Sequence, residues 1–401
     1  MALIAKRLQK IKPSPTLAVT SKAAALRAQG IDIIGLGAGE PDFDTPVNIK
    51  EAAITAIKQG VTKYTDVSGT AALKKAITNK FLTENNIKYK PEQIIVGCGA
   101  KHVIYNALMA SLDPKDEVII PSPFWTSYPD MVLMAEGTPV IVPCTKQNNF
   151  KLTAQTLERA ITNNTKWIIL NSPNNPTGSV YSKEELRALA DILLKYPHVY
   201  VISDDIYEHI IFDNNQFYTL AQVEPKLYPR ILTVNGVSKS YSMTGWRIGY
   251  AGGPVELIKT MTIMQSQSTT NPCSISQASA LEALTGTQNF IPENQTLFSK
   301  RRDLVISMIN KIELLKCNTP GGTFYIFPNC SAMFGKITPD GKILKNSNDV
   351  AEYLLEKALV AVVSGTAFGM DSFFRISYAT SDSLLIKACE RIESACRLLK
   401  A

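Results

Sequence analysis

Short apolar runs, each ended by a polar or glycine-containing turn, recur through the middle of the chain. Runs of this length that are rich in valine and isoleucine are typical of strands buried on both faces of a sheet. Stretches with helical periodicity separate them, and residues 183–196 place leucines along one stripe. We predict strands at 94–96, 117–120, 167–170, 199–202 and 231–234.

Helices that alternate with buried strands predict an α/β fold, with a mostly parallel sheet and crossover helices. We expect this sheet to fill a large domain at residues 48–300, because a chain of 401 residues exceeds the usual size of one hydrophobic core. Residues 301–401 have a different character and predict a smaller α+β domain. There we expect a helix at 300–315 and strands at 322–328 and 373–378.

Composition and charge exclude several classes of protein. Hydrophobic residues make up 45% of the chain and charged residues 19%, which is ordinary for a globular protein and argues against disorder. The net charge of +7 is scattered along the chain rather than gathered into one block, so it mildly favours anionic ligands and we expect no nucleic-acid partner. No run approaches the roughly 20 consecutive apolar residues of a membrane-spanning helix, so we expect no membrane partner.

The seven cysteines are odd in number and widely spaced. They offer neither a paired disulfide framework nor a CxxC metal site. This usage suits a reducing, cytoplasmic compartment, and we expect no metal centre.

A lysine that directly follows a predicted strand is the first candidate for chemistry. Lys239 lies in residues 235–249 (NGVSKSYSMTGWRIG), between small hydroxyl and apolar residues. Such a setting can remove water from the amine and favour its neutral, nucleophilic form. An isolated lysine is far more often a solvated surface group. The distinctive feature here is Arg247, eight positions after Lys239.

Polar residues at the ends of other predicted strands are further candidates, because ligands of open α/β sheets bind there. Asp204 follows one strand, although an aspartate at this position is often only a turn or a helix cap. The turn at 97–101 (GCGAK) precedes a predicted helix, whose backbone amides could bind an anion. Trp125 follows a third strand, where a tryptophan is usually part of the core. Arg375 lies among apolar residues, where an unpaired guanidinium would be costly.

Together these motifs resemble those of class I pyridoxal-phosphate-dependent aminotransferases, and most of all the bacterial aspartate/prephenate aminotransferase subgroup. The similarity runs almost end to end, in the family's order and spacing. The resemblance implies the aspartate-aminotransferase-like fold (fold type I), with residues 1–47 contributing to the small domain and to the rim of the active site. The motifs that carry it are KPSPT at 12–16, GAGEPDF at 37–43, NSPNNPTG at 171–178, SDDIY at 203–207, the segment 235–249, and FFRISY at 373–378.

The resemblance implies pyridoxal 5′-phosphate as cofactor and assigns residues to it. Lys239 is then the catalytic residue, which holds the cofactor as a Schiff base and moves a proton. Asp204 pairs with the ring nitrogen, and Trp125 stacks on the ring. Where some family members have a serine, this chain has Gly236. The other implied cofactor contacts are Gly99, Ala100, Ser238 and Arg247 to the phosphate, Asn175 and Tyr207 to O3′, and Tyr64 from the neighbouring subunit of a homodimer.

The implied substrates are dicarboxylic amino acids and 2-oxo acids. Arg375 would bind the α-carboxylate and Lys101 the distal carboxylate, and Gly39, Trp125 and Asn175 would also border the substrate. The implied reaction is ping-pong transamination of L-aspartate and 2-oxoglutarate to oxaloacetate and L-glutamate. A second implied activity converts prephenate to arogenate with aspartate or glutamate as donor. The markers of that specificity are Lys12 and Thr16.

Two other kinds of protein remain open at this point. An aromatic or alanine aminotransferase, or another fold type I enzyme such as a carbon–sulfur lyase, would keep Lys239, Asp204 and Arg247 but would not need Lys101. A regulator that only senses the cofactor would need an added DNA-binding module, and the motifs occupy the whole chain.

Overall fold

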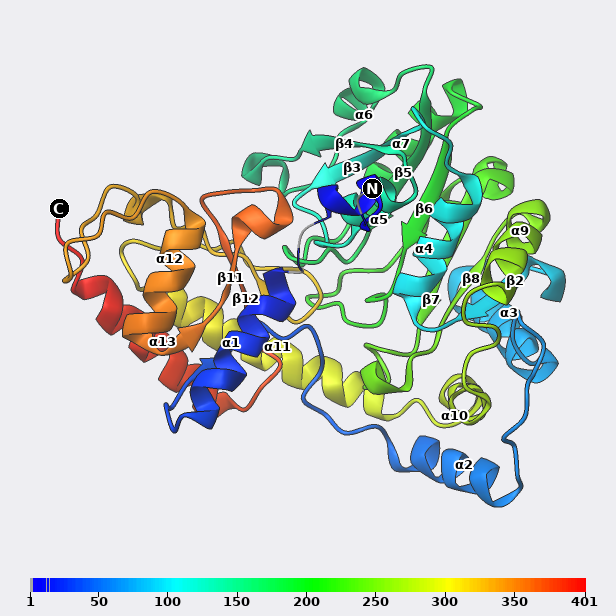
Figure 1. The fold of residues 1–401 in the computed structure, drawn as a ribbon, viewed down its shortest axis with the longest axis horizontal. Helices are drawn as coiled ribbons and strands as arrows, with labels where there is room; N and C mark the ends of the chain where they lie inside the picture. Colours follow the sequence, from blue (N-terminus) through cyan, green and yellow to red (C-terminus); the bar gives the residue numbers. More distant parts are fainter. Residues whose placement is uncertain (1–2, 12, 14) are drawn as a thin grey trace.

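A seven-stranded sheet is the centre of the larger part of the molecule (Figure 1). The computed structural model describes residues 3–11, 13 and 15–401, without the side chains of residues 15–17. The strands are β2 (Ile94–Gly97), β3 (Glu117–Ser122), β4 (Thr138–Pro143), β5 (Thr165–Asn171), β6 (Tyr200–Asp204), β7 (Ile231–Gly236) and β8 (Gly249–Gly252). Their order across the sheet is β2-β8-β7-β6-β5-β3-β4. Strand β8 runs antiparallel to both neighbours, whereas β7, β6, β5, β3 and β4 pair in parallel.

All five predicted apolar runs lie in strands of this sheet, so the mostly parallel α/β fold is confirmed. Two strands, β4 and β8, are additional to the five predicted, although β4 contains a short apolar run at 140–142. Strand β4 is a partly exposed edge strand that begins with Thr138 and Pro139. Strand β8 has the sequence GYAG because its backbone is approached closely: a Cβ on Gly249 would lie 2.1 Å from the amide nitrogen of Ala100.

Helices cover both faces of the sheet. One face carries α2 (Val47–Lys58), α3 (Ala71–Asn85), α6 (Ala154–Ala160), α7 (Lys183–Lys195), α8 (Leu220–Val223) and α10 (Ser274–Thr285), and the other carries α4 (Ala100–Ser111), α5 (Tyr128–Met134) and α9 (Val255–Ser266). Alternate residues of each strand enter the two cores. In β2, Ile94 and Val96 pack on the first side and Ile95 on the second. Loops follow the carboxyl ends of β3, β5, β6 and β7, which is the position at which open α/β sheets bind ligands.

Helix α7 shows how the sequence sets one element. Its residues Leu186, Leu189 and Leu193 recur at helical spacing and are buried against the sheet. Ser182 begins the helix, since its hydroxyl accepts from the amide of Glu185 at 3.2 Å and Glu185 Oε2 accepts from the amide of Ser182 at 2.7 Å. The helix predicted at 183–196 is confirmed to within one residue.

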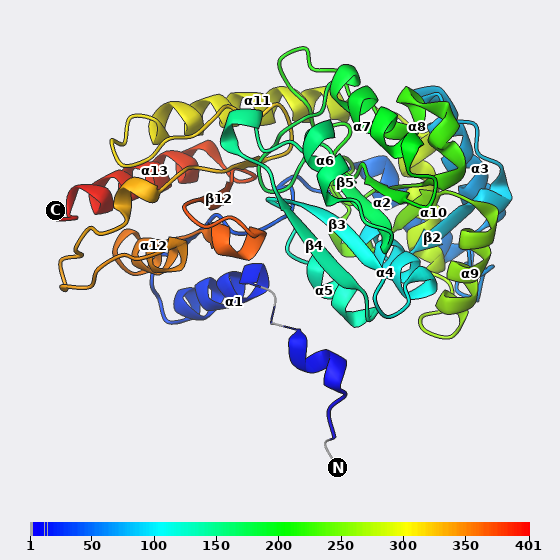
Figure 2. The ribbon, with the colours of Figure 1, turned by 90° about the horizontal axis from the view of Figure 1, so that it is seen from above.

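The smaller part holds α1 and the carboxyl terminus at one end of the molecule, whereas residues 6–10 lie beside α5 of the larger part (Figure 1, Figure 2). It has its own hydrophobic core. Strand β12 pairs antiparallel with β9 and β11, and β1 pairs in parallel with β10. Its elements are α1 (Pro15–Ala28), β1 (Ile34–Gly35), α11 (Phe290–Ile309), β9 (Tyr325–Ile326), α12 (Ser347–Tyr353), β10 (Val360–Ala361), β11 (Val363–Ser364), β12 (Phe374–Ser377) and α13 (Asp382–Arg397).

The carboxyl-terminal predictions are right in type and wrong in extent. Helix α11 begins ten residues before the predicted helix at 300–315 and ends at Ile309. The strand predicted at 322–328 is only the two-residue β9, because the amide of Thr323 bonds instead to the carbonyl of Ile210 in the larger part, at 2.8 Å. Helix α11 crosses the predicted boundary at residue 300, and the division into domains stays a prediction.

Among the described residues no helix is long and apolar enough to cross a membrane. Short helical turns complete the fold. The turns are Lys6–Lys10, Pro91–Gln93, Lys146–Asn148, Pro225–Arg230, Thr244–Trp246, Ser331–Met333, Gly365–Phe368 and the π-helical Leu354–Ala358.

Candidate active site

A cavity of about 370 Å³ lies beyond the carboxyl ends of β5, β6 and β7. Both parts of the molecule form its walls, because Arg375 of β12 lines it together with Asp204 of β6. This is the position at which open α/β sheets bind ligands. Most site residues predicted from the sequence line it: Gly39, Ala100, Lys101, Trp125, Asn175, Asp204, Tyr207, Ser238, Lys239, Arg247 and Arg375.

Four predicted site residues are not among these lining residues. Gly99 lies directly behind the Arg247 guanidinium, since a Cβ at Gly99 would be 2.4 Å from its Nη2 atom. Tyr64 has a side chain that is 89% exposed. Thr16 lies in the first turn of α1, where its side chain is outside the description. Lys12 lies outside the described residues.

Lys239 places its amine inside the cavity, on the segment that follows β7. The amine donates to the carbonyl oxygen of Gly39 at 2.5 Å. Burial, and next the nearby charge of Arg375, lower the pKa of Lys239 to about 8. About a tenth of the amine is therefore neutral at pH 7, far more than for an ordinary lysine, and a nucleophile or a proton acceptor must be neutral.

Asp204 ends β6 and is buried on the wall of the cavity. Its Oδ2 accepts from the hydroxyl of Tyr128 at 2.5 Å, and its backbone carbonyl accepts from Asn171 Nδ2 at 2.9 Å. Burial raises the pKa of Asp204 to about 6, although the bond from Tyr128 lowers it. No ion pair to Asp204 is found among the described residues. A cationic ligand group beside this carboxyl would keep it ionised.

An anion cradle is formed where α4 begins. Gly99 is the N-cap of α4, with a φ of 89°. The first backbone amides of a helix have no carbonyl partner within it, so they can donate to an anion. Arg247 has a φ of 57°, and its guanidinium donates to the carbonyls of Thr244 at 2.8 Å and Cys98 at 3.2 Å. The hydroxyl residue Ser238 lines the same cavity. A guanidinium, a hydroxyl and helix amides are the donors that phosphate prefers.

Trp125 and Lys101 form a second recognition surface in the cavity. The ammonium of Lys101 lies 4.8 Å from the centroid of the Trp125 ring. Burial, and next the charge of Arg247, lower the pKa of Lys101. The indole also meets Tyr128 edge to face, at 5.3 Å between centroids.

Arg375 is 2% exposed, and no carboxylate lies against it among the described residues. Its Nη1 donates to Asn175 Oδ1 at 2.9 Å and its Nη2 to the carbonyl of Gly37 at 2.7 Å. Its Nε has no hydrogen-bond partner. Since an uncompensated buried charge is costly, this guanidinium is suited to an anionic ligand that enters the cavity.

The chain is similar to known proteins over almost its whole length. A family model of the class I and II aminotransferases matches residues 31–392. This chain belongs to that family. A probable aspartate/prephenate aminotransferase of Rickettsia felis is 61% identical over 396 residues, which cover 99% of this chain and 97% of that protein.

Solved structures agree with this assignment. The aspartate aminotransferase from Rhizobium meliloti superposes with a TM-score of 0.97 at 53% identity, covering 100% of both chains. The aspartate aminotransferase from Thermus thermophilus with maleate superposes with a TM-score of 0.92 at 43% identity, covering 98% of this chain and 100% of that one. The fold predicted from the resemblance is therefore confirmed.

The aminotransferase site also contains residues that sequence reasoning did not single out. The hydroxyl of Tyr128 donates to Asp204. Asn171 joins Asp204 to Asn175, because its side-chain nitrogen donates to the Asp204 carbonyl and its Oδ1 accepts from the backbone amide of Asn175 at 2.9 Å. Tyr325 lies against both Tyr207 and Arg375. Asn171 stands at a strand end, which is a usable signal in the sequence. Tyr128 and Tyr325 have none, because only the folded chain brings them to the cavity.

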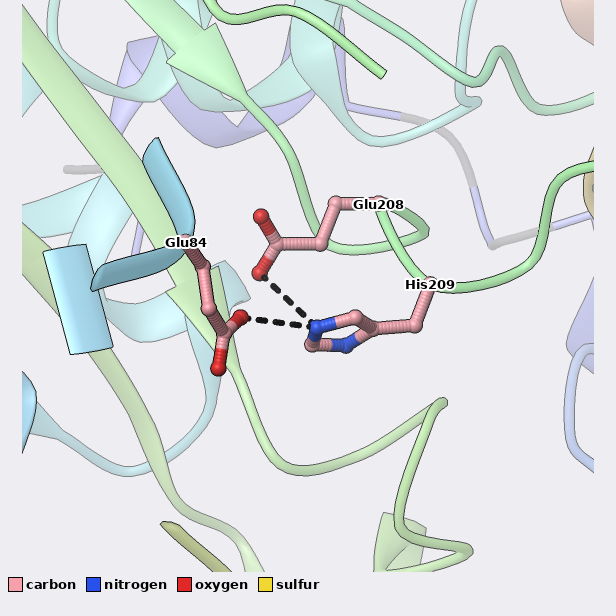
Figure 3. Close-up of side chains that lie close together, drawn as sticks. All are labelled: Glu84, Glu208 and His209. Carbon is pink, nitrogen blue, oxygen red and sulfur yellow. Dashed lines mark hydrogen bonds and ion pairs between the residues drawn. The ribbon is translucent and has the colours of Figure 1, made fainter. Parts of the chain in front are cut away.

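A cluster of titratable side chains lies outside the cavity lining, where Glu208 and His209 of the segment after Tyr207 meet Glu84 of α3 (Figure 3). His209 Nε2 is 2.8 Å from Glu84 Oε2 and 3.9 Å from Glu208 Oε1. The spacing of these atoms suits a metal ion. However, the ammonium of Lys80 pairs with Glu208 and lies 3.4 Å from Glu84, so it already supplies the positive charge. The cluster is an internal ion-pair network.

Proposed function

We propose that this aminotransferase is a pyridoxal-phosphate-dependent aspartate aminotransferase. It transfers the amino group of L-aspartate to 2-oxoglutarate by a ping-pong mechanism, giving oxaloacetate and L-glutamate. The observation that carries the proposal is one cavity in which Lys239, with its lowered pKa, lies between the buried carboxyl of Asp204 and the uncompensated guanidinium of Arg375.

The residues present fit the proposed cofactor. Asp204 lacks the cation that a protonated ring nitrogen would supply, and Trp125 offers a flat ring for stacking. When bound, the cofactor supplies an electron sink that stabilises negative charge at the substrate α-carbon. The other residues that would hold it are Gly99, Ala100, Ser238 and Arg247 at its phosphate, Asn175 and Tyr207 at O3′, and Tyr64 of the partner subunit at the phosphate.

The chain's own groups then have distinct tasks. Arg375 binds the α-carboxylate, which satisfies the free Nε and orients the α-carbon toward Lys239. The neutral amine of Lys239 would leave the carbonyl of Gly39, accept the proton of the substrate α-carbon and hold that proton at Nζ. Lys101 neutralises the distal carboxylate of a dicarboxylic substrate.

We also propose a second activity, the transamination of prephenate to arogenate with aspartate or glutamate as donor. Prephenate carries a second carboxylate, so Arg375 and Lys101 suit it as well. The relative from Rickettsia felis is named for both activities. Lys12 and Thr16 are proposed to set this preference.

A homodimer with shared active sites is part of the proposal. Apolar side chains stand exposed on α2 and just beyond it, with Val47 68%, Ile57 56% and Tyr64 89% exposed. Large apolar groups gathered on one surface favour association with another protein surface. A second copy that covers α2 would bring Tyr64 to its neighbour's anion cradle.

We further propose the domain division 1–47, 48–300 and 301–401, and a cytoplasmic location. The division is supported by the separate core of the smaller part, to which Ile34, Leu36 and Val305 belong. The location is supported by the seven cysteines, all of which are free.

The cofactor is tested by mixing the protein with pyridoxal phosphate and recording the absorbance shift that Schiff-base formation produces. Lys239→Ala should lose both the shift and transamination, whereas Lys195→Ala, an exposed lysine on α7, should retain both. Wild-type turnover in Lys239→Ala contradicts the proposal.

Steady-state kinetics with aspartate, glutamate, prephenate and phenylpyruvate test the substrates. Lys101→Met should raise KM for aspartate and glutamate and leave phenylpyruvate little changed. Unchanged turnover of dicarboxylic substrates would instead favour an aromatic or alanine aminotransferase.

A further inference from the structure

Tyr325 stands where three segments of the site meet. It is a buried residue of β9, and its hydroxyl lies 3.0 Å from the hydroxyl of Tyr207. The centroid of its ring lies 4.4 Å from the guanidinium carbon of Arg375. A Cβ on Gly39 would lie 3.1 Å from the Tyr325 hydroxyl, so this oxygen also touches the segment that accepts the amine of Lys239.

The hydrogen bond between the hydroxyls of Tyr207 and Tyr325 uses one of their two protons and leaves the other for a group in the cavity. Each hydroxyl has one proton, and either oxygen can be the donor in the bond between Tyr207 and Tyr325. The pair therefore keeps one proton free for another acceptor. When Tyr207 gives its own proton to an acceptor in the cavity, Tyr325 becomes the donor of the pair, and a phenol that accepts a hydrogen bond is a stronger donor itself.

We propose that Tyr325 is a positioning residue of the aminotransferase reaction, whose hydroxyl donates to Tyr207 and whose ring holds the guanidinium of Arg375. The inference rests on the proposed function. It links the phenol proposed to bind cofactor O3′ with the guanidinium proposed to bind the substrate carboxylate.

A purely structural aromatic residue would not need the hydroxyl. The ring of Tyr325 packs against Phe324 and Tyr207 in the core of the smaller part, and phenylalanine would fill that space equally well. The strand pairing of Tyr325 with Ser377, two residues from Arg375, already fixes its backbone. Among the described residues, the hydroxyl bonds only to Tyr207, across the boundary with the larger part.

The experiment compares the holoenzyme with three variants. Tyr325→Phe removes only the hydroxyl, and Tyr325→Leu also removes the ring face under Arg375. Tyr378→Phe is the matched control, because it removes another buried phenol of the same core, which donates to the carbonyl of Thr323 at 2.9 Å outside the cavity.

Tyr325→Phe should lower kcat about tenfold, as expected for one buried hydrogen bond, with KM for aspartate changed less than about twofold. It should also raise, by about half a pH unit, the midpoint at which the absorbance of the bound cofactor changes, because Tyr207 becomes a weaker donor. The groups that face Tyr207 are Asp204, Lys239, Arg375, Tyr128 and Tyr325, and the variant alters Tyr325 alone.

Tyr325→Leu should in addition raise KM for aspartate about tenfold, through the loss of the face that supports Arg375. The inference is overturned if Tyr325→Phe keeps the wild-type spectrum and kcat, or if it changes no more than Tyr378→Phe. A wild-type enzyme that binds the cofactor but turns over no dicarboxylic substrate would contradict the proposed function, and the spectra of Tyr325→Phe would still decide this inference.

Discussion

Replacing Lys80 by methionine tests whether the ion-pair network behind the cavity supports the site. Lys80 is 3% exposed and Glu208 4%. Glu208 also accepts from Asn85 at 2.9 Å and from Asn235 at 2.7 Å. Asn235 in turn accepts from the amide of Gly236, which leads to Lys239. Glu208 thus ties the segment after β6 to the carboxyl end of β7.

Lys80→Met leaves the Glu208 carboxylate buried with only two amide donors and the more distant His209. Breaking a buried pair in this way costs about 3–5 kcal/mol in the free energy of unfolding. For a part of this size about 2 °C of Tm corresponds to 1 kcal/mol, so Tm should fall by roughly 6–10 °C. Scanning calorimetry measures this. Glu84→Gln, which removes the more exposed carboxylate of the cluster, should cost less than about 1 kcal/mol.

The difference in Tm between Lys80→Met and wild type should depend on pH, and its direction follows from the pKa of Glu208. Burial raises the pKa of Glu208, but Lys80 and its other partners outweigh burial and hold that pKa below its ordinary value. In the wild type the pair therefore contributes stability above the unfolded pKa of a glutamate, and this stability is lost as the pH falls. Without Lys80, burial raises the pKa of Glu208, so acidification should narrow the difference in Tm between variant and wild type.

Three results would refute this reasoning. One is a Tm of Lys80→Met within about 2 °C of wild type, and another is a difference in Tm that stays constant from pH 8 to pH 5. The third is a double variant, Lys80→Met with Glu208→Gln, that recovers none of the loss, because removal of both charges should restore much of it.

Three further predictions concern the cavity. The apoenzyme should capture pyridoxal phosphate about tenfold faster per pH unit up to pH 8, and at a constant rate above it, because the neutral amine of Lys239 reacts. Absorbance measures this rate, and a rate that does not change with pH would contradict the lowered pKa of Lys239. Arg375→Lys should raise KM for aspartate about a hundredfold in steady-state kinetics, since a point charge replaces a planar fork, and an unchanged KM would remove Arg375 from substrate binding. Gly99→Ala should weaken cofactor binding in equilibrium dialysis, because the added Cβ would displace Arg247 and because Gly99 has a φ of 89°. Gly245→Ala should leave cofactor binding unchanged, because a Cβ there meets nothing within 4 Å.

The residues that could be predicted from the sequence share one property, which is their place at the end of an apolar run or inside a contiguous motif. Asp204, Asn175 and Lys239 follow buried strands, so the rule for parallel sheets already brings them to one edge. Tyr128 and Tyr325 follow no such rule. Their positions depend on contacts between segments distant in sequence, as in the bond between Tyr207 and Tyr325. The sequence does not predict strand β8 for the same reason, because Gly249 is needed where Ala100 approaches and Gly252 where the ring of Tyr89 approaches.

The distribution of charge between the two parts of the molecule explains why the site needs both. Lys239 and Asp204 belong to the larger part, whereas Arg375 belongs to the smaller one and reaches Asn175 across the cavity. A ligand carboxylate that replaces the missing partner of Arg375 would bind both parts at once, so binding energy far from the reacting carbon would also fix the distance to Lys239. A monocarboxylic amino acid can satisfy Arg375 but leaves Lys101 without a partner. Selectivity for dicarboxylic substrates should therefore appear chiefly in kcat/KM, as the difference between one and two neutralised cations.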